Sequence, residues 1–174
     1  MEYEVIALTG GEAHACCGAL AEILIACVHS GASVSFMAPL ARDKAESFWR
    51  GVADSVERGE RVVIIARERG ASRILGTVQV LLKQVENQQH RADVAKMLVH
   101  PEARRRGIGA QLLSFAEEAA RRAGKSLLVL DTATGGDAER LYERMGWARV
   151  GVIPDYALWP DGRPCSTTVF YKRL

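Results

Sequence analysis

The sequence predicts a single α/β domain over residues 1–174, built on a mixed, mostly antiparallel sheet with helices on both faces. Strand-like and helix-like segments are interspersed along the whole chain, with no low-complexity linker or internal repeat between them. The length of 174 residues suits one hydrophobic core. A composition of 48% apolar and 25% charged residues is typical of a folded globular protein.

The first part of the chain predicts one strand and two helices. Alternating residues predict a strand over Tyr3–Leu8, and apolar residues at helical spacing predict a helix over Glu12–Val28. Residues 30–40 form a loop of small residues and hydroxyls with two large apolar side chains. A second helix is expected over Arg42–Arg58, where Gly59 ends it.

The middle of the chain predicts a hairpin and a third strand. The hairpin pairs residues 61–67 with 73–82 through a turn at 68–72. A polar connection over 83–89 leads to a strand over 92–100, which Pro101 ends.

The last part predicts an amphipathic helix, a short helix and three strands. The amphipathic helix spans Ile108–Ala123, with an apolar stripe of Ile108, Leu112, Phe115, Ala116, Ala119 and Ala123. A buried strand (126–131), a short helix (137–145), a strand (147–152), a loop (154–164) and a last strand (167–172) follow.

Composition and charge exclude several classes of protein. A net charge of +2 is too small to indicate nucleic acid as the main partner. The N-terminus lacks the basic region of a signal peptide, and the longest apolar stretch, 13–28, is too short and polar to span a bilayer. None of the four cysteines forms a C-x-x-C pair, so no disulfide framework or metal site is expected. We therefore expect a cytoplasmic protein with no membrane partner.

A basic, glycine-containing loop between the 92–100 strand and the amphipathic helix predicts an anion site. The first N–H groups of a helix lack intrahelical partners and lie at the positive end of its dipole. Gly107 and Gly109 let a phosphate approach the backbone, and Arg104–Arg106 add positive charge. The alternative is a solvated basic loop, but the preceding strand, Pro101 and the following helix favour a ligand site.

Two motifs give the sequence a resemblance to the GNAT acetyltransferases. Arg104-x-x-Gly107-x-Gly109, after the segment 97–101, resembles the acetyl-CoA signature of that family, and the segment 138–147 with Tyr142 resembles a second family element. Gly135 stands where the family usually has an Asn, a departure that affects one contact to the pantetheine arm. Segments 31–37, 130–132, 149–156 and 168–174 also resemble the tabtoxin-resistance branch.

The resemblance implies acetyl-CoA as cofactor and a set of residues that bind it. Met97, Leu98 and Val99 would offer backbone groups to the pantetheine arm, which pairs like an added strand. The diphosphate would lie on Arg104, Arg105, Arg106, Gly107, Ile108, Gly109 and Ala110. The strands at 92–100 and 126–131 would part to admit the thioester.

Three residues are candidates for the chemistry of acetyl transfer. Tyr142 is the candidate general acid, because a phenol with a pKa of ~10 keeps its proton at neutral pH; alternatively, it packs on the sheet and bonds a carbonyl. Asp131 and Asp93 are candidates for accepting the amine proton or for holding the ammonium. The alternatives are a turn cap for Asp131 and an exposed strand-end charge for Asp93.

The acceptor is expected between the 30–37 loop and the 154–164 segment, where Ser33, Phe36, Met37 and Tyr156 would bind it. The same residues are alternatively loop anchors or dimer contacts.

The predicted function is transfer of acetyl from acetyl-CoA to the amine of a small molecule, by direct attack and without a covalent enzyme intermediate. The resembled branch implies an amino-acid-like toxin or antibiotic as acceptor. A monomer or homodimer is expected. The alternatives are a non-catalytic acetyl-CoA sensor and a protein or peptide N-acetyltransferase.

Overall fold

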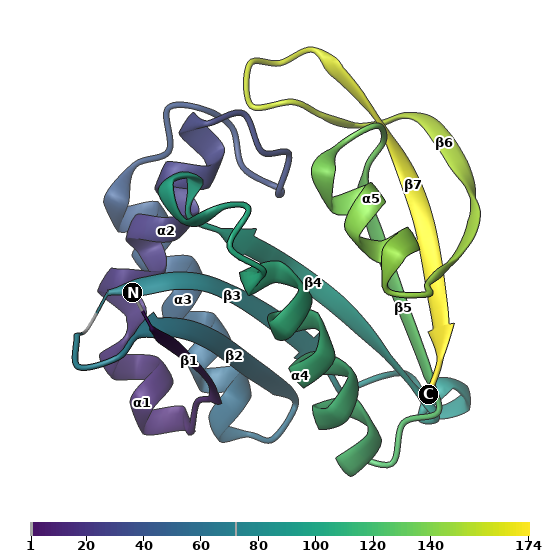
Figure 1. Cartoon of the computed structure of the whole chain (residues 1–174), viewed down its shortest axis with the longest axis horizontal. Helices are drawn as coiled ribbons and strands as arrows, with labels where there is room; N and C mark the ends of the chain where they lie inside the picture. Colours follow the sequence, from purple (N-terminus) through teal and green to yellow (C-terminus); the bar gives the residue numbers. More distant parts are fainter. Residues whose placement is uncertain (1, 72) are drawn as a thin grey trace.

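The computed structural model describes residues 2–71 and 73–174. Figure 1 shows the arrangement of its helices and strands. In chain order these are β1 (Tyr3–Ala7), α1 (Gly10–Ala15), α2 (Cys17–His29), α3 (Arg42–Glu57), β2 (Arg61–Glu68), β3 (Ile74–Leu81), β4 (Arg91–Val99), α4 (Ile108–Arg122), β5 (Leu127–Ala133), α5 (Asp137–Arg144), β6 (Ala148–Leu158) and β7 (Pro164–Arg173). Short 3-10 turns at Glu86–Gln88 and Pro101–Ala103 flank β4.

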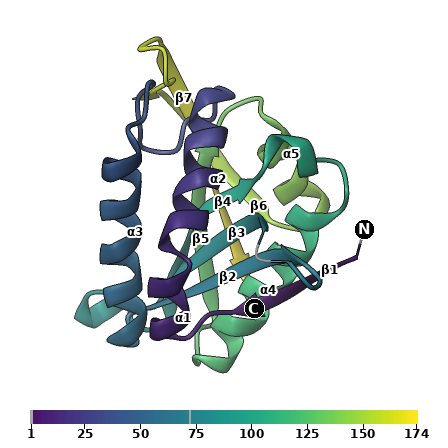
Figure 2. The same cartoon turned by 90° about the vertical axis from the view of Figure 1, so that its left-hand side faces the viewer.

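One seven-stranded sheet organises the molecule, with the strand order β1-β2-β3-β4-β5-β7-β6. Every neighbouring pair is antiparallel except β4 and β5, which are parallel. Figure 2 shows α1, α2 and α3 on one face of the sheet and α4 and α5 on the other. The predicted fold class, a mixed and mostly antiparallel sheet with helices on both faces, is therefore confirmed.

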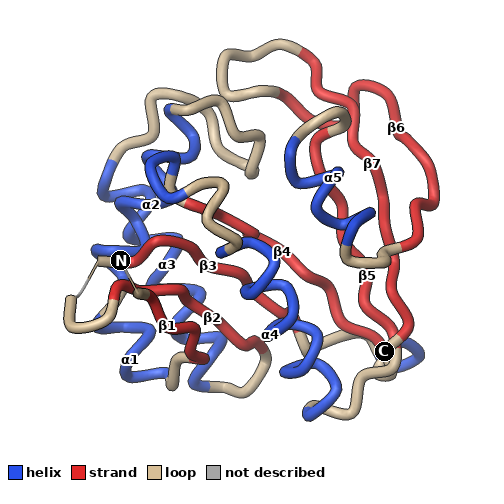
Figure 3. The backbone as a smooth tube through the Cα atoms, viewed as in Figure 1, coloured by secondary structure: helices blue, strands red, loops and turns tan. Residues whose placement is uncertain are grey.

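The parallel pair is short compared with its strands. Only Arg91–Asp93 of β4 pair with Leu127–Val129 of β5, although both strands continue beyond that point. In Figure 3 the two strands diverge from their shared end. The predicted parting of these strands is therefore present, and it divides the sheet into a β1–β4 part and a β5–β7 part.

Helix α4 lies directly against β3 because of a glycine in that strand. A Cβ atom on Gly76 would lie 2.9 Å from Leu112 Cδ1, 3.0 Å from Ile108 Cγ2 and 3.0 Å from the Leu98 carbonyl oxygen. The absence of a side chain at Gly76 thus lets two core residues of α4 contact the sheet. The buried stripe of α4 runs through Leu113 and Ala120, so Phe115 at its edge is 46% exposed, contrary to prediction.

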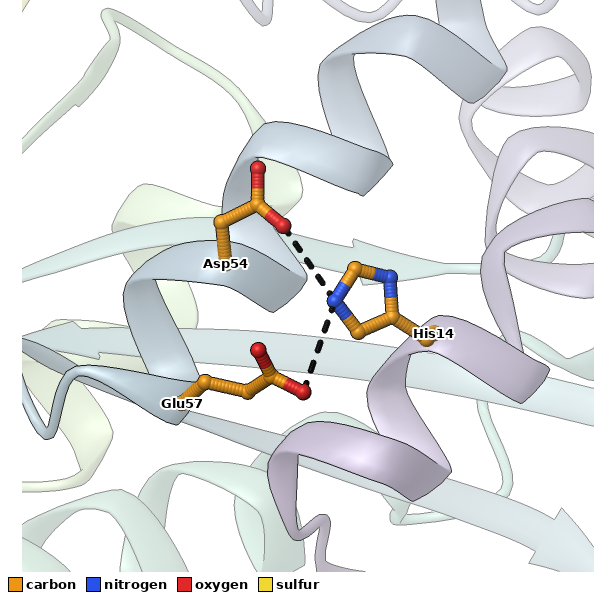
Figure 4. A group of neighbouring side chains, drawn as sticks. All are labelled: His14, Asp54 and Glu57. Carbon is orange, nitrogen blue, oxygen red and sulfur yellow. Dashed lines mark ion pairs between the residues drawn. The ribbon is translucent and has the colours of Figure 1, made fainter.

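The helix predicted over Glu12–Val28 is two helices, which meet at Cys16. Thr9 caps α1 through a capping box with Glu12, and α1 packs on α3. Figure 4 shows the ion pairs between them: His14 Nε2 lies 3.2 Å from Asp54 Oδ1 and 3.7 Å from Glu57 Oε1. The packing of α1 against α3 accounts for its separation from α2 as a distinct helix.

The predicted loop over 154–164 is mostly strand. β6 continues through Pro154 to Leu158, and β7 begins at Pro164. Proline is tolerated here because β6 is the edge strand and its register with β7 shifts between Ile153 and Ala157. Ser72 of the predicted hairpin turn lies outside the described residues. Within the described residues no helix is long and apolar enough to cross a membrane.

A buried carboxylate joins α4 to the far part of the sheet. Glu117 is 6% exposed, and its Oε1 accepts from Trp147 Nε1 at 3.0 Å. Lys172 Nζ on β7 lies 2.8 Å from both Glu117 carboxylate oxygens and donates to the Met145 carbonyl at 2.7 Å. Because both partners are largely removed from water, loss of Lys172 would leave the Glu117 charge poorly compensated, with the guanidinium of Arg121 4.0 Å away.

Lys172→Met is expected to lower the free energy of unfolding by about 3 kcal/mol, because the buried Glu117 carboxylate loses the cation that contacts both its oxygens and keeps only the distant Arg121, 4.0 Å from Oε2. Urea unfolding measures the loss. Arg122→Met removes a surface pair with Glu118 on the same helix and is the matched control, expected to cost less than about 1 kcal/mol. Equal losses in the two variants would contradict a structural role for the buried pair.

Candidate active site

The N-terminus of α4 presents an open stretch of backbone beside the end of β4. Gly107 is the N-cap residue, with φ at 78°, and Arg105 also has a positive φ of 61°. The nearest atom to a Cβ built on Gly107 would be Tyr3 Oη, 4.0 Å away. The backbone is therefore uncovered at the end of the helix where unpaired N–H groups favour an anion.

The residues around this N-terminus contribute in different ways. Arg104 donates from Nη2 to Ser30 Oγ at 3.0 Å, which attaches the loop to the end of α2, whereas the Arg105 side chain is exposed. Ile108 is buried in the core. A Cβ on Gly109 would lie 3.1 Å from Leu141 Cδ2, so this glycine also lets α5 approach α4 closely.

The end of β4 that lies beyond its last pair with β5 contains Met97, Leu98 and Val99. Leu98 and Val99 pair with Thr77 and Gly76 of β3, and β5 has no pairing with this part of β4 in the described chain. The edge of β4 that faces the parted strands is therefore geometrically suited to receive an extended, amide-containing chain as an added strand.

Tyr142 lies on α5 and is 4% exposed. Its ring packs against Trp147 and Phe170, with centroids 5.9 Å and 5.8 Å apart. Burial, and after it the charge of Asp131, raises the pKa of the Tyr142 phenol, so the group is protonated at neutral pH. Within the described residues its hydroxyl makes no hydrogen bond to a carbonyl or to any other group.

A cavity of about 320 Å³ brings together all four predicted acceptor-binding residues, Ser33, Phe36, Met37 and Tyr156, with Asp131. It lies where the 30–40 loop meets the end of β6. The remaining lining residues are Ser35, Thr132, Ala133, Ala157, Leu158 and Thr167. The hydroxyl of Ser33 donates to the Leu158 carbonyl at 2.8 Å, so Ser33 joins the two walls of the cavity.

Asp131 and Tyr142 lie on opposite sides of β5. Leu128 and Leu130 share a buried cluster with Tyr142, and Asp131 alternates with them along the strand. Asp131 is exposed, and its carboxylate makes no hydrogen bond or ion pair with the described residues. Among the described residues, no hydrogen bond of Asp131 supports the alternative role of a turn cap.

Asp93 does not line the cavity. Its carboxylate pairs with Arg91 Nη1, and its Oδ2 accepts from Gln84 Nε2 at 2.9 Å. Both oxygens are therefore engaged near the start of β4, and the acid at the cavity is Asp131. Trp159, which lies in the connection between β6 and β7, lines a separate hollow of about 230 Å³.

Lys96 is a residue near the cavity that sequence reasoning missed. It lies in a bulge of β4, where the register with β3 shifts, and has a φ of 51°. Its Nζ donates to Ser35 Oγ at 3.1 Å and lies 5.7 Å from the centroid of the Phe48 ring. A lysine in a strand pattern resembles an ordinary exposed position, and nothing in the sequence marks the bulge that reorients it.

Comparisons with known proteins agree on one family. Residues 58–149 match the family described as the acetyltransferase (GNAT) domain. An uncharacterised N-acetyltransferase from the hisH-hisA intergenic region of Azospirillum brasilense is 32% identical over 126 residues, which cover 71% of this chain and 70% of that protein.

Two solved structures show the same fold. The yncA protein of Salmonella typhimurium, whose structure includes its cofactor acetyl-CoA, matches with a TM-score of 0.80 and 20% identity over 100% of this chain and 95% of its own. The ribosomal-protein-alanine N-acetyltransferase of Brucella melitensis matches with a TM-score of 0.80 and 20% identity over 98% of this chain and 99% of its own.

Proposed function

Because the chain belongs to the GNAT acetyltransferase family and is an acetyl-CoA-dependent acetyltransferase, we propose that it acetylates the amine of a small molecule. The acceptor attacks directly, without a covalent enzyme intermediate. The observation that carries this proposal is the small cavity at Asp131, which lies along the part of β5 beyond its pairing with β4 and across β5 from Tyr142.

The cofactor fits two features of this chain. The uncovered backbone at Gly107 suits a diphosphate, with Arg105–Ala110 as the residues that hold it and Arg104 fixing the loop to Ser30. Met97, Leu98 and Val99 offer the free edge of β4 to the pantetheine arm. When bound, acetyl-CoA supplies an activated acyl group.

The catalytic roles follow from charge and burial. Asp131 accepts the proton of the attacking amine or holds the ammonium before attack, because its carboxylate is exposed at the cavity and unpaired within the described chain. Tyr142 donates a proton to the departing thiolate, since burial keeps its phenol protonated. Asp93, engaged by Arg91 and Gln84, has the weaker claim as base.

The size of the cavity supports a small acceptor. A volume of about 320 Å³ is near the lower end of the ~300–1,000 Å³ range of small-molecule pockets. A peptide acceptor is the second candidate, and a non-catalytic sensor of acetyl-CoA is the third; the unpaired acid and the buried phenol favour an enzyme. The same proposal includes a single domain over residues 1–174 and a cytoplasmic location. It also includes a role in resistance to an amino-acid-like toxin or antibiotic.

The oligomeric state is proposed as monomer or homodimer. Exposed apolar side chains on the edge strand β6, among them Val150 and Ile153, are compatible with a dimer contact.

A turnover screen tests the proposed function. Release of the CoA thiol is measured with amino acids, polyamines, aminoglycosides and short peptides as acceptors. Turnover of one or more small amines is expected. Turnover confined to peptides would replace the small-molecule acceptor by a peptide, and acetyl-CoA binding without any turnover would favour a sensor.

Gly107→Val is expected to weaken acetyl-CoA binding at least tenfold, or about 1.4 kcal/mol, because a β-branched side chain disfavours the positive φ and covers the backbone. Calorimetry measures the affinity. Gly124→Val places the same side chain at a φ of 73° beyond the other end of α4 and controls for strain alone. Unchanged affinity in a folded Gly107 variant would remove this site from the proposal.

Tyr142→Phe is expected to leave acetyl-CoA affinity nearly unchanged and to lower turnover by roughly 10²-fold, because the proton donor is lost while the ring packing stays. Steady-state kinetics and calorimetry separate the two effects. Tyr171→Phe removes a hydroxyl from a partly exposed tyrosine on β7 and is the control. Equal turnover in the Tyr142 variant and the wild type would make Tyr142 structural.

Asp131→Asn distinguishes two roles of the same carboxylate. A base predicts lower turnover at saturating amine and a flatter rise of rate with pH, whereas an ammonium contact predicts chiefly a higher KM. The pH–rate profile and the kcat and KM values decide between them. If kcat, KM and the pH–rate profile all stay unchanged, Asp131 has no role in the site, and Asp93 becomes the candidate base.

A further inference from the structure

Two side chains of opposite charge flank the acceptor cavity without contacting each other. Asp131 lines the cavity directly, and Lys96 reaches it through its hydrogen bond to Ser35, which also lines it. The Asp131 charge raises the pKa of Lys96, yet the Nζ of Lys96 lies within 4.0 Å of no carboxylate among the described residues. A direct ion pair, which would occupy both charges, is thus not formed, and both stay available to a ligand.

The backbone is strained at the same place. Four described residues other than glycine have a positive φ: Ser35, Lys96, Arg105 and Asp155. Ser35 and Lys96 are the hydrogen-bonded pair at the cavity, and Asp155 precedes Tyr156 in its wall. Such conformations are unfavourable for residues other than glycine and persist where the surrounding structure imposes them, often at ligand sites. The bulge therefore directs the Lys96 ammonium to the side of the cavity, a position that a regular strand would not give it.

The ammonium of Lys96 is largely removed from water, and Asp131 and Arg61 both act on its charge. Arg61 of β2 is close enough to influence Lys96, and among the described residues its guanidinium donates to the neutral Gln79 side chain, while its Nε is buried without a hydrogen-bond acceptor. Burial lowers the pKa of Lys96; the Asp131 charge opposes this shift, and the smaller influence of Arg61 adds to it. A carboxylate placed beside Lys96 would compensate its ammonium for the water lost on burial.

We propose that the acceptor is zwitterionic: Lys96 binds a carboxylate of the acceptor while Asp131 receives its amine. The inference rests on the proposed function and adds the substrate class, a small amino acid or amino-acid-like compound. Lys96 is then a residue that determines specificity, and the Ser35 hydroxyl positions its ammonium. The two charges fix the direction in which the acceptor enters, with the amine towards β5 and the carboxylate towards β4.

The test compares amino acids with their carboxamides as acceptors. L-alanine, L-leucine and L-phenylalanine are each paired with the corresponding amide, which keeps the size and the amine but lacks the negative charge. The amine of a carboxamide is less basic, so chemical reactivity alone would favour the amide. We expect kcat/KM of the wild type to be at least tenfold higher for the acid in the pairs that are turned over.

Variants of Lys96 assign this preference to the side chain. Lys96→Met should raise KM for the acid at least tenfold and abolish the preference, while Lys96→Arg should retain most of it. Lys83→Met is the control, because it removes an exposed ammonium that pairs with Glu60 and lines no part of the cavity. Calorimetry with acetyl-CoA checks that each variant remains folded and binds the cofactor.

The outcomes separate this inference from the function on which it rests. Amines without a carboxylate that are turned over as well as the acids, or a Lys96→Met variant that slows acid and amide equally, would overturn the zwitterion and leave the small-amine function intact. Turnover confined to peptide amines would overturn both. Turnover of neither member of any pair would also contradict the inference.

Discussion

The parting of β4 from β5 is the constraint on which the rest of the site depends. A sheet that kept its pairing beyond Asp93 and Val129 would satisfy the backbone groups of β4 internally and leave no entry between the strands. The bulge in β4 falls just beyond the parting, and it turns Lys96 towards Ser35. The acid on β5, the phenol on α5 and the lysine on β4 all lie around this one discontinuity, although they are far apart in the sequence.

Close packing of α4 fixes where the proposed cofactor site lies relative to that parting. Gly76 lets Ile108 and Leu112 contact the sheet, and Gly109 lets Leu141 approach the first turn. At the other end of the helix, Glu117 is held by Lys172 and Trp147 from beyond the parted strands. The helix thus bridges the two parts of the sheet, so its N-terminus is positioned by rigid contacts on both sides.

Sequence reasoning predicted the fold class and nearly every element, because periodicity is a local property. The resemblance, not periodicity, led to the grouping of Ser33, Phe36, Met37, Tyr156 and Asp131, which line one cavity; their roles remain proposals. Sequence reasoning failed where tertiary context decides. The break at Cys16 depends on packing against α3, the extension of β6 through Pro154 depends on that strand being at the edge, and the role of Lys96 depends on a bulge. The contacts of Asp93 with Arg91 and Gln84, which weaken its claim as base, likewise depend on the folded structure.

Asp131 acts electrostatically on both faces of the sheet. Burial is the main cause of the raised pKa of Tyr142 and of the lowered pKa of Lys96, and the Asp131 charge raises the pKa of both groups. The ionised carboxylate therefore favours a protonated phenol on one side and a protonated ammonium on the other. In the proposed reaction, a proton or an ammonium group reaching Asp131 would cancel this influence. The Tyr142 phenol would then become a stronger acid after the amine has lost its proton, which is when the thiolate must gain one.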